Sequence, residues 1–453
     1  MNPTIGAMAA ARSTAIVLSV VCSVLVPGES LADAVTDWNA NAANASRAAC
    51  LAPALDPFHE SRAYAMMHIA IHDALNAIDR RSRPYAYDSR SVPWASSDAA
   101  VAAAARDVLV SAIAEAPSFE GVPGCLGSLQ AGIDRVEADY TAALAAIPDG
   151  PPKTIGLRTG RRAAAAILAL RAADGSDTPF ADPEYPQSMQ PGEWRFTPGF
   201  DFALLPGWRH VTPFVLRRGS QFRPDGPYSL RHHKYTRDFN EVKGIGGDDV
   251  TTPSSRTLEH TEIGRFWIDS SPLMWNRIAR TLSASQALDL WENARLFGLL
   301  NMALADGYIA SFDTKYHYTF WRPITGIQMA DTDGNPDTVA DPTWTPLQQT
   351  YPMPDYDSAH SVEGGAGAEV LKQFFRTDRI PFSTSSLTLL PGQTCDDASP
   401  IVRSYVSFTQ AADENANSRV YIGIHFRKAV EDGTGHGRQT GKRAVKLFMQ
   451  TLR

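Results

Sequence analysis

Hydrophobic residues recur along most of this chain at the spacing of an α-helix. Residues 61–80 (SRAYAMMHIAIHDALNAIDR) carry apolar side chains around most of the helical circumference, which predicts a buried helix. The same periodicity predicts further helices at 99–116, 129–147, 153–173, 254–268, 274–282, 285–312, 361–375, 401–417, most of 418–430, and 437–451. Because no alternating strand pattern competes, we predict an all-α fold: one large helical domain of one or two packed bundles.

The segment 174–256 departs from this pattern. Proline, glycine and aromatic residues are dense there, and no helical period is sustained. Aromatic side chains such as Trp194 and Trp208 would be costly to leave in water, so the segment is predicted to be a long, ordered, irregular excursion or lid.

The N-terminal 34 residues are typical of a secretory signal peptide. Arg12 precedes an apolar run from Ala15 to Val26, and a Pro-Gly break and small residues follow. The run of about twelve residues is too short for a membrane-spanning helix, and no later segment continues for ~18 residues without a charge. We therefore expect an exported protein, periplasmic or secreted, whose mature chain (35–453) is a single domain without a membrane span.

The net charge argues against one class of partner, and the cysteines indicate a disulfide. A formal net charge of -7 over 453 residues argues against nucleic acid as the main partner. Cys22 belongs to the predicted signal peptide, and Cys50, Cys125 and Cys395 show no CxxC spacing. An oxidising compartment predicts one disulfide and one spare thiol; the sequence leaves the pairing open, with Cys50–Cys125 the pair that we favour.

Three short clusters of basic and hydroxyl residues stand out in this acidic chain. In the first, Lys315 and Arg322 are seven positions apart, which on one helix places them on the same face, two turns apart. The planar donor fork of arginine and the compact charge of lysine suit a tetrahedral anion. Two surface bases flanking an aromatic segment would give the same pattern, so this pair is weak evidence by itself.

The second cluster, residues 356–361, lies where a loop ends and an apolar helix begins. Asp357 or Ser358 can cap that helix, which would leave the amide near Ala359 free to bind an anion. His360 can then act as a general acid or base. The competing interpretation is an ordinary capped helix with an exposed histidine.

The third cluster places Arg419 and His425 six positions apart. On a regular helix the two side chains would diverge by roughly 120°, so we expect a bend, which Gly423 can supply. A neutral imidazole there could bind a metal oxyanion or attack phosphorus. The competing interpretation is a histidine packed in the core.

Taken together, the clusters occur in the order Lys-x6-Arg-Pro, Ser-x-His, Ser-Arg-x5-His. This order resembles the tripartite signature of the type-2 phosphatidic acid phosphatase (PAP2) and vanadium haloperoxidase superfamily (K-x6-RP, PSGH, SR-x5-H-x3-D). The flanking sequences at 320–325, 418–426 and 62–78 are similar to the bacterial vanadium-dependent haloperoxidase branch. The resemblance covers most of the mature chain and is strongest over 285–443.

This resemblance implies a cofactor, a reaction and a role for each motif residue. The cofactor is vanadate, and the implied reaction is the oxidation of halide by hydrogen peroxide, with a small organic acceptor as a further partner. In the phosphatase relatives the same pocket holds phosphate, and His425 would form a phosphohistidine. The implied oxyanion ligands are Lys315, Arg322, Ser358, Ala359 (through its amide) and Arg419, with His360 as the acid–base residue and His425 as the vanadium ligand.

Three positions depart from the family pattern. Asp357 and Ala359 replace the proline and glycine of PSGH, and Asp357 would weaken anion binding unless its side chain caps the helix. Ala429 replaces the aspartate that fixes the histidine, a loss predicted to cost roughly 10–100-fold in affinity or activity. On this interpretation Ala429→Asp should raise activity.

Three functional hypotheses follow from the motifs and their departures. The leading one is a haloperoxidase, with an acid phosphatase and an oxyanion-binding protein of weakened catalysis as alternatives. Chloride-oxidising relatives tend to have an aromatic residue where this chain has Met353, so bromide or iodide is the expected halide. The organic substrate and the oligomeric state are left open.

Other polar clusters are assigned structural roles. His68 and His72 have a zinc-like spacing, but they lie inside an apolar helix and are predicted to be core residues. The glycine-rich stretch 433–437 is predicted to be a hinge before the last helix.

Overall fold

The computed structural model describes residues 33–52, 56–122 and 124–452, so the predicted signal peptide lies outside the described residues except for its last two positions. The α-helices are α1 (Ala34–Ala48), α2 (Pro57–Ile78), α3 (Ser97–Ala114), α4 (Leu129–Ala145), α5 (Pro151–Arg171), α6 (His233–Ile245), α7 (Leu258–Phe266), α8 (Ser271–Gln286), α9 (Leu290–Tyr318), α10 (Pro323–Gln328), α11 (Ala359–Phe375), α12 (Phe408–Tyr421) and α13 (Arg427–Leu447). The 3-10 helices are η1 (Pro206–His210), η2 (Gly219–Phe222) and η3 (Ala330–Thr332). The strands are β1 (Ala181–Asp182), β2 (Ala203–Leu204), β3 (Phe382–Ser385) and β4 (Val402–Tyr405), paired antiparallel as β1–β2 and β3–β4.

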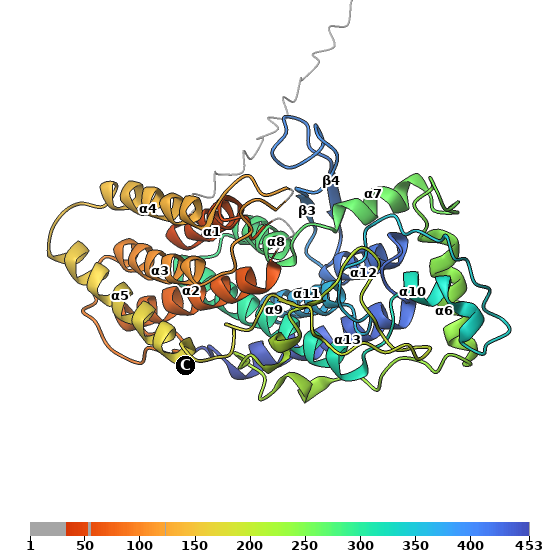
Figure 1. The fold of residues 1–453 in the computed structure, drawn as a ribbon. Coiled ribbons are helices and arrows are strands. Elements are labelled where there is room, and N and C mark those ends of the chain that lie inside the picture. The colour runs from red at the N-terminus through yellow and green to blue at the C-terminus, as the bar shows by residue number, and fades with distance from the viewer. Residues whose placement is uncertain (1–32, 53–55, 123, 453) are drawn as a thin grey trace, which may run out of the picture. The chain divides into compact units, whose positions relative to one another are not determined.

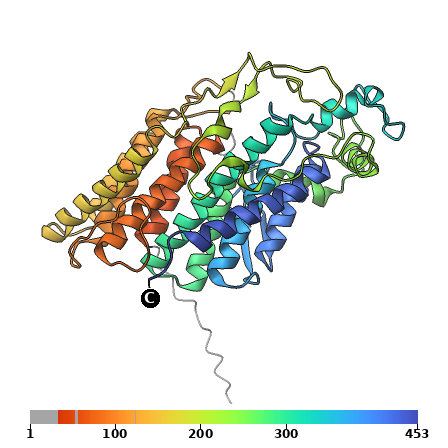
Figure 2. The ribbon, with the colours of Figure 1, turned by 90° about the horizontal axis from the view of Figure 1, so that it is seen from below.

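The helices pack around α9, which confirms the all-α prediction. Helix α9 contacts α2 on one side and α11 and α13 on the other (Figures 1 and 2). Helices α3 and α5 pack on α2, and α11 packs on both α12 and α13. None of the helices in the described ranges is long and apolar enough to cross a membrane.

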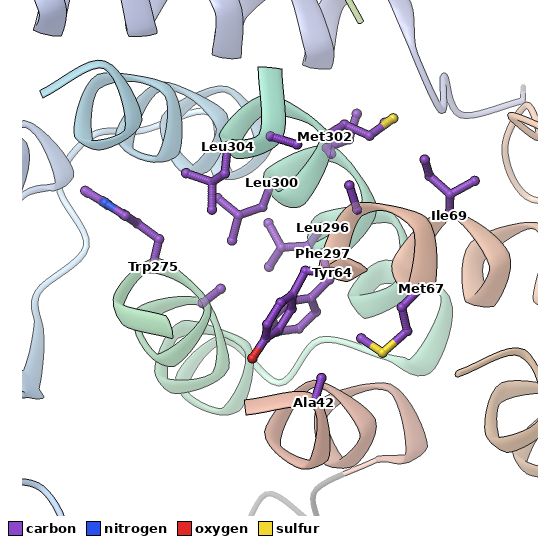
Figure 3. Close-up of a cluster of buried hydrophobic side chains, with 14 of the residues drawn as sticks. Ala42, Tyr64, Met67, Ile69, Trp275, Leu296, Phe297, Leu300, Met302 and Leu304 are labelled. Atoms are coloured by element: carbon purple, nitrogen blue, oxygen red, sulfur yellow. The ribbon is translucent and has the colours of Figure 1, made fainter. Parts of the chain in front are cut away.

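The main hydrophobic core forms where α1, α2, α8 and α9 meet. Figure 3 shows Tyr64 and Met67 of α2 facing Phe297 and Leu300 of α9, with Trp275 of α8 beside them. All five side chains are buried. The apolar residues that surround α9 on all sides explain why this helix runs through the interior.

The excursion at 174–256 is ordered and contains one helix that the sequence pattern did not predict. Helix α6 begins after His232, whose Nδ1 accepts the Lys234 amide at 3.1 Å, and it packs Tyr235, Phe239 and Val242 into a second apolar cluster. The excursion is tied to α9 by Asp306, whose carboxylate accepts the backbone amides of three consecutive residues at 2.6–2.7 Å: Phe214, Val215 and Leu216.

The predicted helix at 401–417 is wrong at its start. Residues 402–405 form strand β4, which pairs with β3, and α12 begins only after Ser407. The Ser407 hydroxyl accepts the Gln410 amide at 3.1 Å, so this side chain caps the helix and sets its first residue.

The predicted hinge at 433–437 is also wrong, because these residues lie inside the continuous helix α13. Their glycines allow α13 to approach α11 closely. A Cβ atom on Gly437 would lie 1.7 Å from the Val362 carbonyl oxygen, and one on Gly441 would lie 2.5 Å from that of Ala366. The tertiary contact between the two helices therefore explains Gly437 and Gly441.

Gly437→Ala is expected to destabilise the fold by about 1–3 kcal/mol, because the added methyl group forces α13 away from α11. Denaturant unfolding of the two proteins measures the change. Gly435→Ala is the matched control: it lies in the same helix, where an added Cβ atom would meet no other atom within 4 Å, and it should be neutral or stabilising. Equal effects of the two substitutions would contradict the packing explanation.

One disulfide joins the two N-terminal cysteines of the described chain. Cys50 and Cys125, 75 positions apart, are bonded, which agrees with the favoured pairing. The bond connects the end of α1 to the segment before α4. Cys395 is a free thiol.

Candidate active site

The residues of the three basic clusters are brought to one cavity by five helix ends and turns. Lys315 lies in the last turn of α9, Arg322 immediately precedes α10, His360 lies in the first turn of α11, and Arg419 lies in the last turn of α12. His425 follows in the turn before α13. The polar lining consists of Ser270, Lys315, Arg322, His360, Arg419 and His425, together with Ala359 at the start of α11.

Lys315 and Arg322 reach the cavity differently from the prediction of one shared helical face. Helix α9 ends at Tyr318 because Thr319 has a left-handed backbone (φ 45°), and Arg322 lies in the next segment. The Lys315 Nζ atom donates to the carbonyl oxygens of Pro354 and Asp355 at 3.0 Å each. Neutral carbonyl groups hold the ammonium in place without cancelling its charge.

The bend predicted between Arg419 and His425 is present. Helix α12 ends at Tyr421, and Gly423 adopts a left-handed backbone with φ 81°. A Cβ atom at this glycine would lie 2.5 Å from the carbonyl oxygen of Gly246, so both the conformation and the contact favour glycine. The turn directs Arg419 and His425 to the same cavity.

His425 is held as a neutral imidazole with a lone pair on Nε2. Its Nδ1 lies 2.8 Å from Asp355 Oδ1, and its Nε2 lies 3.0 Å from Arg322 Nη1. Because a guanidinium can only donate, Nε2 is the acceptor and Nδ1 carries the proton. Burial, and then the charges of Arg322 and Lys315, hold the pKa of His425 well below its ordinary value.

Asp355 is the functional residue that the motif comparison missed. Ala429 stands where the family motif has the aspartate that fixes the histidine, and Asp355, 70 positions earlier in the chain, supplies a carboxylate partner instead. Burial raises the pKa of Asp355 to about 7, while Arg322 and Lys315 oppose that rise. In the sequence, the one feature that could have identified Asp355 is its place two positions before Asp357 of the second cluster.

Asp357 neither caps α11 nor enters the cavity. Its two carboxylate oxygens bond the Ser311 hydroxyl and His436 Nδ1, at 2.8 Å each, behind the helix N-terminus. Ser358 is the cap: its hydroxyl oxygen accepts the Ser361 amide at 3.4 Å. Ser358 is buried and is not part of the cavity lining, so its predicted contact with the oxyanion stays a prediction.

Arg419 Nη1 and His360 Nε2 are buried at the cavity and have no hydrogen-bond partner among the described residues. The other Arg419 nitrogens donate to the Trp267 carbonyl at 2.6 Å and to the Ser418 hydroxyl at 2.9 Å. Burial lowers the pKa of Arg419 to about 10, and it holds that of His360 well below its ordinary value.

The site therefore has more buried positive charge than its carboxylates balance. Three cations face one cavity, and burial lowers the pKa of Lys315 and Arg322 as well as that of Arg419. The Ala359 and His360 amides, in the first turn of α11, add donors without a partner inside the helix. An oxyanion would bond these donors and offset the cost of burying the charges. The donor set fits vanadate or phosphate.

Apolar side chains form the remaining walls, and several come from distant parts of the chain. Phe58 comes from α2, Leu204 from the excursion, and Tyr308 from α9. The other apolar lining residues are Pro57, Ile268, Tyr351, Met353 and Ile424. Such walls exclude water from the charged groups, which strengthens their interactions.

The alternative histidine pair has the structural role predicted for it. His68 Nε2 lies 2.8 Å from the Asn39 amide nitrogen, and His72 lies between Asp73 and Ser82. Within the described ranges, no group of three or more His, Cys, Asp or Glu side chains could hold a metal ion.

Comparisons with known proteins find similarity to vanadium haloperoxidases. Residues 295–453 match the family model for the VCPO second helical-bundle domain. The chain is 25% identical over 279 residues to vanadium chloroperoxidase from Curvularia inaequalis, a match that covers 49% of this chain and 45% of that protein. The chain thus spans less than half the length of this curated relative.

Solved structures extend the similarity to nearly the whole chain. A bacterial vanadium-dependent iodoperoxidase superposes with a TM-score of 0.74 at 24% identity, covering 93% of this chain and 97% of its own. The apo form of a bacterial vanadium-dependent chloroperoxidase gives a TM-score of 0.66 at 15% identity, covering 87% and 94%. The chain therefore has the fold of the vanadium haloperoxidases, and its residues 295–453 match the family model of the VCPO second helical-bundle domain.

Proposed function

We propose that this protein is a vanadium-dependent haloperoxidase, which oxidises halide with hydrogen peroxide and passes the oxidised halogen to a small organic acceptor. The observation that carries the proposal is the neutral His425, whose Nε2 accepts from Arg322 at a cavity lined by three basic side chains, so that an oxyanion bound to Arg322 can take over the Nε2 lone pair. A lone pair beside several donors is suited to a metal oxyanion, which needs one nitrogen ligand and hydrogen bonds to its oxygens.

The side chains divide the work. Lys315, Arg322 and Arg419 would hold the vanadate oxygens, and the Ala359 amide would add a donor from the helix N-terminus. Vanadate, when bound, supplies a Lewis-acidic centre that makes hydrogen peroxide electrophilic. His360 is neutral near pH 7, because burial lowers its pKa, and its unpartnered Nε2 can take and return a proton.

We infer that the preferred halide is bromide or iodide. Met353 lines the cavity where chloride-oxidising relatives tend to have an aromatic residue, and its polarizable thioether favours a large, soft halide. The similarity to a solved structure described as an iodoperoxidase is in line with this inference. Rates measured with chloride, bromide and iodide at matched concentrations test it, and a preference for chloride would refute it.

The test of the main proposal is halogenation of a phenolic dye by the purified protein with vanadate, peroxide and bromide or iodide. We expect vanadate-dependent turnover, lost in Arg419→Gln and kept in Arg438→Gln, whose exposed side chain bonds Asp413 away from the cavity lining. Absence of turnover with every halide between about pH 4 and pH 8 would refute the proposal.

The same lone pair also suits a second reaction, phosphate ester hydrolysis with His425 as the nucleophile. Hydrolysis of p-nitrophenyl phosphate by vanadate-free protein, abolished in His425→Ala, would favour the phosphatase. If both assays fail and vanadate still raises the melting temperature, the protein only binds the oxyanion. Ligand at 100 times its Kd should stabilise the fold by about 2.7 kcal/mol.

We further propose that the protein is exported after cleavage of residues 1–34. The Cys50–Cys125 disulfide supports an oxidising compartment. N-terminal sequencing of the mature protein from the native cell tests this: an intact Met1 on protein recovered from the cytoplasm would contradict it.

A further inference from the structure

Two carboxyl groups that the proposed reaction does not use are buried directly behind the cavity. Glu60 lies on α2 and Glu363 on α11, and both residues are 0% exposed. Glu60 Oε1 has no hydrogen-bond partner among the described residues, and the Glu363 carboxyl group faces the hydroxyls of Tyr308 and Ser271 and no cation. An unpaired carboxylate in such a place is costly, so the neutral acid is the stable form.

The charged and titratable groups around the pair reinforce this. Burial raises the pKa of Glu60 to about 8, and the neighbouring Asp269 and Asp56 add to the rise. Burial also holds the pKa of Glu363 well above its ordinary value, and Glu60 adds to that rise. The other polar groups that face the two acids are Ser46, Ser270, Ser271, Tyr64 and Tyr308. The cations of this region face the tyrosines: Arg277 and Arg280 lie near Tyr64, and Arg419 lies near Tyr308.

One hydroxyl connects each acid to the cavity. The Ser270 hydroxyl is hydrogen-bonded to Glu60 Oε2 at 2.5 Å, and Ser270 lines the cavity. Tyr308 also lines the cavity, and its buried hydroxyl faces Glu363 and Ser271.

Glu363 also lies on the same side of α11 as His360, three positions away. On the facing helix α9, a Cβ atom at Gly307 would lie 3.4 Å from Glu363 Cγ, so the carboxyl-bearing side chain packs against α9 beside Tyr308. Neither acid lines the cavity itself, but each lies beside a residue that does: Ser270 for Glu60 and Tyr308 for Glu363.

We propose that Glu60 and Glu363 are a proton reservoir that supplies the cavity through the hydroxyls of Ser270 and Tyr308. The inference rests on the proposed function, in which peroxide, halide and one proton give hypohalous acid and water. In each transfer the O–H bond of the carboxylic acid breaks and its proton passes to the hydroxyl oxygen. The hydroxyl gives its own proton to water or to His360 Nε2 in the cavity. The carboxylate that remains regains a proton from solvent by the reverse route before the next turnover.

Infrared spectroscopy tests the reservoir without relying on activity. The vanadate-loaded wild-type protein at pH 7 should show carbonyl bands of protonated carboxyl groups, and Glu60→Gln and Glu363→Gln should each remove part of that signal. Glu369→Gln is the matched control: it lies on the same helix, accepts a hydrogen bond from Gln373 at 2.7 Å, and should leave the bands unchanged. Absence of the bands from the wild-type protein, or bands unaffected by both substitutions, would overturn the proposal.

Steady-state kinetics test the route. Each Gln variant should lose about tenfold in kcat near pH 8, recover near pH 5 where solvent protons are plentiful, and keep its KM for halide and peroxide. Tyr308→Phe and Ser270→Ala should show the same kinetic loss while keeping the infrared bands, and both are conservative enough to fold. If the wild-type enzyme oxidises halide and all four variants keep its pH profile, the proton reservoir is refuted while the proposed function stands. A wild-type protein that oxidises no halide sinks the proposed function and the relay with it.

Discussion

Asp355→Asn is expected to weaken vanadate binding and halide oxidation by about 10–100-fold each. The carboxylate of Asp355 accepts the Nδ1 proton of His425 at 2.8 Å and so keeps the Nε2 lone pair available. An asparagine side chain can turn its NH2 group toward Nδ1, which favours the tautomer that carries its proton on Nε2. That tautomer has no lone pair for the vanadium.

Calorimetric titration of the vanadate-free protein with vanadate measures the loss of affinity. Asp331→Asn, an exposed position of η3, serves as a control for the same chemical change outside the site. Unchanged vanadate affinity in Asp355→Asn would mean that Arg322 alone fixes the imidazole, through its 3.0 Å bond to Nε2.

Ala429→Asp is expected to destabilise the fold by about 3–5 kcal/mol and to bring no gain in activity. The structure reverses the expectation drawn from the family motif, because Asp355 already accepts the His425 proton. Ala429 is 1% exposed and belongs to the apolar cluster that contains Tyr235 and Phe426. A carboxylate introduced there would be buried without a cation.

Thermal unfolding and dye halogenation of Ala429→Asp measure both effects. Ala429→Asn has nearly the same shape without the charge, so the difference between the two variants isolates the electrostatic cost. A more active Ala429→Asp enzyme would show that His425 is poorly held by Asp355 and gains from a second acceptor.

The helical fold was predictable because it is recorded in local periodicity. Helices such as α2 and α9 have a buried face that continues over many turns, which a single sequence displays. Strand β4 was missed because its stability depends on pairing with β3, about twenty positions away. The glycine-rich stretch of α13 was mistaken for a hinge, because a glycine such as Gly437 is needed there for close packing against α11. That contact is not visible in the local sequence.

The sequence was sufficient to predict the motif residues of the site. It was not sufficient to predict the side chains that hold them in place. The spacing of the basic clusters identified Lys315, Arg322, Arg419 and His425, since these positions match a known signature. Asp355 contacts His425 across 70 positions, so only the packing of the two loops reveals it. The role of Asp357 behind the helix likewise depends on His436, 79 positions later.

All three basic side chains that line the cavity belong to the last third of the chain. Phe58 and Leu204, which form part of its apolar wall, come from the first half. The anion-binding side chains and part of the apolar wall are therefore encoded in separate parts of the chain. Substitutions of Phe58 or Leu204 are expected to change which substrates fit the cavity without lowering its affinity for the anion. A fragment limited to residues 295–453 would keep all of the cations but expose them to bulk water, where the same charges attract an anion far more weakly.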